Sequence, residues 1–315
     1  MLGYWIAAEA CFIGVLAGLA IFAWRRVAAR HSGTAPPTEF VWIPIGILHG
    51  IIGTVLLMLG QAGVLPLWAL ATGRPMAQQG FLFSVVLGVG GFMAPRLMGR
   101  TTLPVTPGVI GKEEARRIRM RRVRWHALAG LALFVTFWIE GAGAVAAAYR
   151  LRALLVTAEL AWTSRFYRPP SVADRYVQLV WISLWMMVLG FWGAGLFIRF
   201  RVAMLHLAFI GGLSLMAFAV ATMVVMSHAG EGRRLRQPLW VLRVVGVGVA
   251  IAMVVRVIAD AVPALFFQML GMAAAAWAVA GISWLVFALQ LLVRRATPEA
   301  FEQLHEEAKR RLLKQ

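Results

Sequence analysis

Residues 202–227 read VAMLHLAFIGGLSLMAFAVATMVVMS, a run without lysine, arginine, aspartate or glutamate. At 1.5 Å per residue, a helix of this length crosses the roughly 30 Å hydrocarbon core of a bilayer with room to tilt. Arg199 and Arg201 precede the run, and Arg233, Arg234 and Arg236 follow it. An apolar run of span length between basic ends predicts a membrane helix.

Apolar runs of about this length recur along the chain. We expect nine spans, near residues 2–24, 41–60, 77–96, 126–147, 149–165, 176–198, 202–227, 238–258 and 262–293, with the second open to extension through 61–71. The composition agrees, because 61% of residues are hydrophobic and 14% are charged, against roughly a quarter charged in soluble domains. The sequence therefore predicts an all-α, polytopic transmembrane helical bundle that forms one domain over residues 1–296.

The basic residues predict the orientation of this bundle. With the N-terminus outside and the C-terminus cytoplasmic, 24 of the 31 Lys and Arg residues fall in cytoplasmic segments and 6 fall outside. Positive charge collects in this way on the cytoplasmic side of membrane proteins. The net charge of +18 is thus explained without nucleic acid, for which the chain offers no soluble basic domain.

Two basic segments are expected outside the spans. The cytoplasmic loop 97–125 contains a Pro/Gly-rich stretch, Thr101–Gly111, and then a short basic helix, Lys112–Arg124, that we expect to contact anionic lipid headgroups. Residues 297–315 are predicted to form an amphipathic tail helix, with Thr297 as N-cap and Pro298 in its first turn.

Glycine is frequent inside the predicted spans, as at Gly46, Gly50 and Gly53 and at Gly211-Gly212. Such residues let helices approach closely, and helix packing is their expected role. A flat cofactor between helices would need similar faces. The single cysteine, Cys11, permits no disulfide within the chain and is expected to be a small buried side chain.

Ionisable side chains within a membrane are costly and are the candidates for function. They are Glu9, His49, Arg96, His126, Glu140, Glu159, His206, His228 and Arg243. The sequence contains no HExxH, P-loop or paired-cysteine motif, so zinc-protease and nucleotide-driven chemistry have no support. Each buried glutamate needs a partner, for which Arg152 and Arg243 are available, and a structural ion pair and a proton-relay role both remain open.

Histidine can bind iron or copper through one ring nitrogen. His206 and His228 lie 22 residues apart in sequence, about 33 Å along a helix, so they cannot hold one metal together. By depth, His126, His228 and Arg96 are expected at the inner side, where an arginine could contact a haem propionate. His49 and Glu159 are expected near mid-depth, and His206 and Glu140 nearer the outside. For every histidine, a structural hydrogen bond to a neighbouring helix is the alternative.

Two segments carry a resemblance to a known family. The run Leu205-His206-Leu207-Ala208-Phe209-Ile210-Gly211-Gly212, followed by Ser227-His228-Ala229-Gly230, resembles a signature of the NnrS family, bacterial membrane proteins linked to the response to nitric oxide. The run from Gln79-Gly80-Phe81 to Pro95-Arg96-Leu97 is similar to another family segment. Two features depart from the pattern: Ala221-Thr222-Met223 stands where an arginine is expected, and typical members have about twelve spans.

The resemblance implies a haem- and copper-containing protein of the bacterial cytoplasmic membrane. Such a protein would relieve nitrosative stress, with nitric oxide as its small-molecule ligand. By position it points to His206 and His228 as metal ligands and to Arg96, His49 and His126 around a cofactor. Two other functions remain open: a proton-coupled transporter or channel that uses Glu9, Glu140 and Glu159, and a non-catalytic scaffold that recruits a partner through its basic segments.

Overall fold

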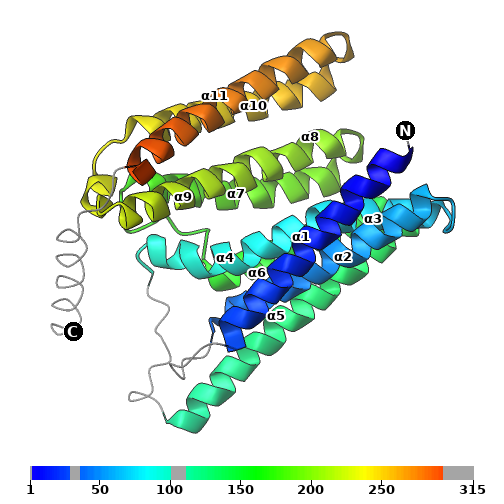
Figure 1. Ribbon diagram of the computed structural model, residues 1–315, viewed down its shortest axis with the longest axis horizontal. Coiled ribbons are helices and arrows are strands. Elements are labelled where there is room, and N and C mark those ends of the chain that lie inside the picture. Colours follow the sequence, from blue (N-terminus) through cyan, green and yellow to red (C-terminus); the bar gives the residue numbers. More distant parts are fainter. Residues whose placement is uncertain (1, 29–35, 101–110, 294–315) are drawn as a thin grey trace. The chain divides into compact units, whose positions relative to one another are not determined.

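The computed structural model describes residues 2–28, 36–100 and 111–293, and all regular structure in these ranges is helical (Figure 1). The elements are α1 (Leu2–Ala28), η1 (Thr38–Val41), α2 (Trp42–Gln61), α3 (Leu67–Pro75), η2 (Met76–Gly80), α4 (Phe81–Leu97), α5 (Lys112–Gly141), α6 (Val145–Thr163), α7 (Arg175–Leu196), η3 (Ile198–Phe200), α8 (Arg201–His206), η4 (Leu207–Ser214), α9 (Leu215–His228), η5 (Gly232–Arg236), α10 (Trp240–Ala261), η6 (Pro263–Leu265) and α11 (Phe266–Val293). The all-α prediction is confirmed. The predicted tail helix lies outside the described residues.

Seven helical segments of the described chain are long and apolar enough to cross a membrane. They are Tyr4–Arg25, Thr38–Gln61, Leu67–Leu97, Arg175–Leu196, Ile198–His228, Trp240–Ala261 and Pro263–Val293. They correspond to the predicted spans one to three and six to nine. The protein is therefore a multi-pass membrane protein, and its orientation in the bilayer remains a prediction.

The predicted spans at 126–147 and 149–165 are also helical but are absent from this apolar set. Both fall on helices with several charged residues. The first half of α5 is basic, and α6 carries Arg150, Arg152 and Glu159 within 19 residues. The break between them was predicted near residue 148 but lies at residues 142–144, and the passage of these two helices through a bilayer stays a prediction.

Three further predicted boundaries were wrong. The second span does not extend through 61–71: α2 ends at Gln61, and the chain turns at Gly63, whose φ is +73°. The third span begins earlier than predicted, at Leu67, because α3, η2 and α4 follow one another without a break. Residues Lys112–Arg124 are not a separate helix but the first half of α5, which continues to Gly141.

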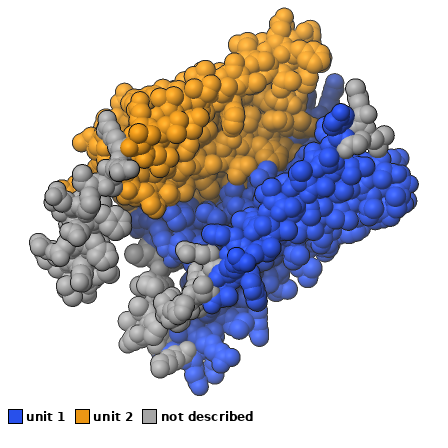
Figure 2. Space-filling model, in the orientation of Figure 1, with its two compact units in different colours: residues 1–169, 191–201 blue, residues 170–190, 202–315 orange. Residues whose placement is uncertain are grey.

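The chain divides into two compact units (Figure 2). Unit 1 comprises residues 1–169 and 191–201, and unit 2 comprises residues 170–190 and 202–315. Helix α7 therefore contributes its first part to unit 2 and its last turns to unit 1. Each unit is described separately below.

In unit 1, glycines of α2 bring that helix close to α3, η2 and α4. A Cβ atom built on Gly53 would lie 2.4 Å from the backbone nitrogen of Ala77, and one on Gly46 would lie 2.9 Å from Cβ of Ser84. Neither position has room for a side chain. This geometry supports the packing role predicted for these glycines.

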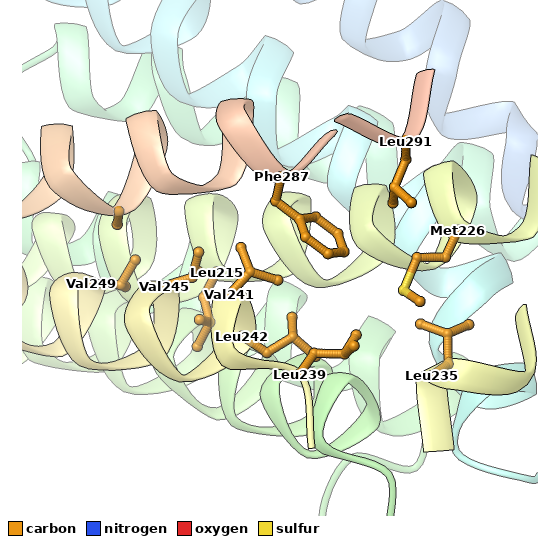
Figure 3. Close-up of a cluster of buried hydrophobic side chains, with 11 residues drawn as sticks. Leu215, Met226, Leu235, Leu239, Val241, Leu242, Val245, Val249, Phe287 and Leu291 are labelled. Carbon is orange, nitrogen blue, oxygen red and sulfur yellow. The ribbon is translucent and has the colours of Figure 1, made fainter. Parts of the chain in front are cut away.

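Unit 2 is built around an apolar cluster between α9, η5, α10 and α11 (Figure 3). It comprises Leu215, Met226, Leu235, Leu239, Val241, Leu242, Val245, Val249, Ala280, Phe287 and Leu291. Trp284 on α11 packs against the cluster and donates its indole N–H to Oγ1 of Thr222 at 3.0 Å. The buried core of this unit is therefore almost entirely apolar.

Candidate functional site

The Glu159 carboxylate is the centre of a buried polar cluster in unit 1. Its Oε1 accepts the indole N–H of Trp42 at 2.9 Å and lies 2.6 Å from Nδ1 of His126, and its Oε2 accepts the indole N–H of Trp125 at 2.9 Å. Glu159 and His126 are each 1% exposed. Both oxygens of Glu159 therefore accept an indole N–H, one from α2 and one from α5, and Oε1 also lies against the His126 ring.

A second buried cluster surrounds Arg152, which is fully buried on α6. Its Nη2 lies 2.6 Å from Oε2 of Glu140, its Nε donates to Oγ1 of Thr136 at 2.9 Å, and its Nη1 donates to Oε1 of Gln79 at 3.1 Å. Gln79 in turn donates to the hydroxyl of Tyr149 at 2.9 Å. A buried guanidinium needs both a counter-charge and acceptors for its N–H groups, and this cluster supplies both.

His49 of α2 lies between two aromatic rings of α5. Its Nδ1 is 3.2 Å from the hydroxyl of Ser84, Phe134 stacks on its ring at 5.8 Å between centroids, and Phe137 meets it edge-on at 5.6 Å. Phe137 also faces the guanidinium of Arg152 at 4.1 Å. With 2% exposure, His49 is a packed side chain that connects the middle of unit 1 to the arginine cluster.

Two π-helical segments lie beside histidines. In unit 1, η2 begins after Pro75, whose missing N–H interrupts the α-helical ladder. A Cβ on its last residue, Gly80, would lie 2.9 Å from Cβ of His49. In unit 2, η4 begins directly after His206. Widened turns of this kind recur at functional sites, which keeps His206 as a candidate, whereas the ring of His49 is already enclosed by Phe134, Phe137 and Ser84.

In unit 2, His206 ends α8 and is partly buried. Its Nδ1 lies 2.7 Å from the carbonyl oxygen of Val202, one turn earlier. Arg256 and Asp260 of α10 form an ion pair at 2.5 Å and lie close enough to interact with the imidazole. His206 is thus fixed by its own helix, with a polar pair nearby.

His228 ends α9 and is exposed. Its Nδ1 lies 2.8 Å from the carbonyl oxygen of Val224, again one turn earlier. A carbonyl oxygen can only accept, so both His206 and His228 carry the ring proton on Nδ1 when neutral. Their Nε2 atoms then present a lone pair, which is the form that coordinates a metal.

Arg96, predicted to contact a cofactor, is exposed near the end of α4. Its Nη1 donates to the carbonyl oxygen of Phe92 at 2.5 Å, and its guanidinium lies 3.6 Å above the Phe92 ring. Its neighbour Arg100 has the more extensive contacts: it donates to the carbonyl oxygens of Ser164 and Arg168, and also to those of Arg165 at 2.6 Å and Pro169 at 3.1 Å. Arg100 thus fixes the loop after α6.

The remaining candidates are separate from these clusters. Glu9 of α1 interacts with Gln61 and Arg74 within unit 1. Cys11 was expected to be buried and is exposed. Arg243 is exposed on α10, and within the described ranges no group of three or more His, Cys, Asp or Glu side chains is placed to hold a metal ion.

The structure joins some of the predicted residues and not others. Glu140 pairs with Arg152, which was one of the two predicted partners. Glu159 pairs with His126, a pairing that the sequence did not suggest. Trp42 and Trp125 were not predicted as partners of a glutamate, yet both donate to Glu159. The sequence did offer one signal for these pairings: a buried carboxylate needs hydrogen-bond donors at its own depth in the membrane.

Comparisons with known proteins agree with the sequence resemblance. No curated protein and no solved structure matches the chain significantly. A family model described as NnrS protein matches residues 1–295. Because that match covers almost the whole chain, including all four histidines of these sites, the protein belongs to the NnrS family.

Proposed function

We propose that this NnrS-family membrane protein binds haem through His206 or His228 and acts in the response to nitric oxide in the bacterial cytoplasmic membrane. The observation that carries the proposal is the shared geometry of the two imidazoles. Each donates Nδ1–H to a carbonyl oxygen of its own helix, at 2.7 Å and 2.8 Å. This contact fixes the ring and leaves Nε2 as the coordinating atom.

The potential metal ligands among the described residues suit haem better than a copper centre whose ligands all come from the protein. Copper sites gather several nitrogen or sulfur donors at one point, and the described chain places no group of three His, Cys, Asp or Glu side chains together. A haem needs only one or two axial imidazoles. When bound, it would supply the iron that takes nitric oxide as a ligand.

The chain's own residues would determine how that group is held. The Arg256–Asp260 ion pair of α10 lies close enough to His206 to interact electrostatically with its ring. His228 is followed by η5, which carries Arg233, Arg234 and Arg236, and such cations suit carboxylate groups. Arg96 of unit 1 contacts one carbonyl oxygen and one ring, and a contact between this arginine and a cofactor stays a prediction.

The buried glutamates fit structural roles better than a proton or cation path. Glu140 faces the fully buried Arg152 at 2.6 Å, and Glu159 is bounded by two indole N–H groups and by His126. A relay residue must change partners as it gains and loses its proton. These carboxylates are instead surrounded by donors from several helices, and we therefore prefer haem binding over transport.

The test is the absorption spectrum of the purified full-length protein, produced with haem supply. We expect a Soret band that shifts when nitric oxide is added, and that weakens or shifts in His206→Ala or His228→Ala. His49→Ala is the matched control and should keep the band, since its ring lies between Phe134 and Phe137. A folded wild-type protein without a Soret band would overturn the proposal.

A further inference from the structure

The first half of α5 carries a hollow whose lining changes character along the helix. Its walls are Arg117, Met120, Arg121, Arg124, Trp125, Leu128 and Trp162, and it encloses about 530 Å³. An adjoining hollow of about 440 Å³ is lined by Glu113, Arg116, Arg117, Met120 and Arg124. Together they place four arginines against one glutamate at one end, and two indoles and a leucine at the other.

The change from a basic to an apolar lining occurs over about the depth of a membrane interface. Arg124 and Leu128 are one helical turn apart, about 6 Å, which is close to the roughly 5 to 8 Å depth of one headgroup layer. Tryptophan prefers this layer, and arginine clusters at a membrane surface attract anionic lipids. Trp125, Leu128 and Trp162 are all exposed, with Leu128 at 64%, so the apolar end is open to an acyl chain.

The apolar wall is held in place from inside unit 1. The indole N–H of Trp125 donates to Oε2 of Glu159, whose other oxygen contacts His126 and Trp42. Trp162 of α6 lies beside Trp125, with ring centroids 5.8 Å apart and an angle of 30° between planes. A wall that is fixed before binding loses little conformational entropy when a ligand arrives.

We propose that this surface, formed by Arg117, Arg121, Arg124, Trp125, Leu128 and Trp162, is a specific site for one anionic phospholipid. The phosphate and its negative headgroup lie among the arginines, and an acyl chain lies along Leu128 and the two indoles. Charge complementarity selects a net-negative lipid over a zwitterionic one. The apolar wall selects a lipid over a free anion.

The test measures binding to the full-length protein in neutral detergent micelles, where no continuous charged surface exists. The probes are phosphatidylglycerol, phosphatidylcholine and inorganic phosphate, and Kd is measured by titration or native mass spectrometry. We expect phosphatidylglycerol to bind more tightly than the other two probes. Equal binding of phosphatidylcholine, or equal binding of inorganic phosphate, would overturn the proposal.

Two double variants of α5 separate a site from general attraction. R121Q/R124Q removes two arginines from the lining, and R119Q/R122Q removes two from the same helix outside it. Each arginine near an anionic surface contributes about 1 kcal/mol, so R121Q/R124Q should weaken phosphatidylglycerol binding roughly 30-fold. The control should lose less than about threefold, and R121K/R124K, which keeps the charge, should stay close to wild type. Equal losses in the two Gln variants would overturn the assignment to this surface.

Discussion

Units 1 and 2 differ in how their candidate polar residues are bonded. In unit 1, Arg152 and Glu159 contact side chains from several helices. In unit 2, His206 and His228 contact carbonyl oxygens of their own helices, and the core cluster is apolar. A side chain bonded across helices specifies packing, whereas one bonded only to its own helix is oriented without holding two helices together. The comparison thus separates structural residues, such as Arg152 and Glu159, from the candidates for ligand binding, His206 and His228.

The largest expected effect is at Arg152. Arg152→Met leaves Glu140 as a buried carboxylate without its counter-charge and removes the donor to Gln79 and Thr136. Loss of one partner of a buried ion pair costs about 3–5 kcal/mol. We expect the free energy of unfolding in detergent, measured with denaturant, to fall by that amount.

The double variant E140Q/R152M serves as the control for Arg152→Met. It removes both charges, and it should recover part of the loss because no buried charge is left alone. If Arg152→Met cost less than about 1 kcal/mol, the cluster would not be the stabilising element that unit 1 requires.

Glu159 should show the next largest effect. Glu159→Gln keeps one acceptor oxygen but turns an N–H group toward the donors from Trp42, Trp125 and His126. A buried donor left without its acceptor costs about 1–3 kcal/mol, and we expect a loss of about 2–3 kcal/mol in the free energy of unfolding.

Glu231→Gln in unit 2 is the matched change, because Glu231 pairs with Arg234, whose side chain is 50% exposed. Exposed pairs contribute about 0–1 kcal/mol, so this variant should unfold almost as wild type does. Equal losses at Glu159 and Glu231 would remove the distinction between the two units.

Glycine packing gives a smaller contrast of the same kind. Gly53→Ala places a Cβ 2.4 Å from the backbone of Ala77, where relief requires α2 to move, and overpacking of this kind costs about 1–3 kcal/mol. Gly271→Ala on α11 of unit 2 meets nothing within 4 Å, and it should stabilise the helix by up to about 1 kcal/mol. Thermal unfolding of both variants beside wild type checks the opposite signs.

The sequence predicted the fold well because each apolar run has the length of a span, and length is a local property. It was less accurate where charge and apolar character share a helix. Residues 112–124 read as a separate basic helix, yet nothing in Arg124-Trp125 breaks a helix, and α5 continues through them. The extension of the second span failed because Ala62-Gly63 forms a turn that the apolar pattern hides.

The candidate site was predicted in part for a similar reason. Burial cost alone identified Glu140, Glu159 and the histidines, and Arg152 was recognised as a partner. The pairing of His126 with Glu159 depends on how α5 and α6 face each other, since the two residues are 33 positions apart on different helices. Trp42 and Trp125 were missed as donors because tryptophan at a span end is usually explained by the interface alone.

The smallest expected effect is at His228, and it decides how the two units are interpreted. His228 is exposed and bonds only the carbonyl oxygen of Val224. His228→Ala should therefore change the free energy of unfolding by no more than about 0.5 kcal/mol. His49→Ala should cost about 2 kcal/mol or more, because its buried ring fills the space between Phe134 and Phe137. Equal and large losses in both variants would show that the ring of His228 is needed for packing, and the contrast between a structural unit 1 and a ligand-binding unit 2 would then have to be abandoned.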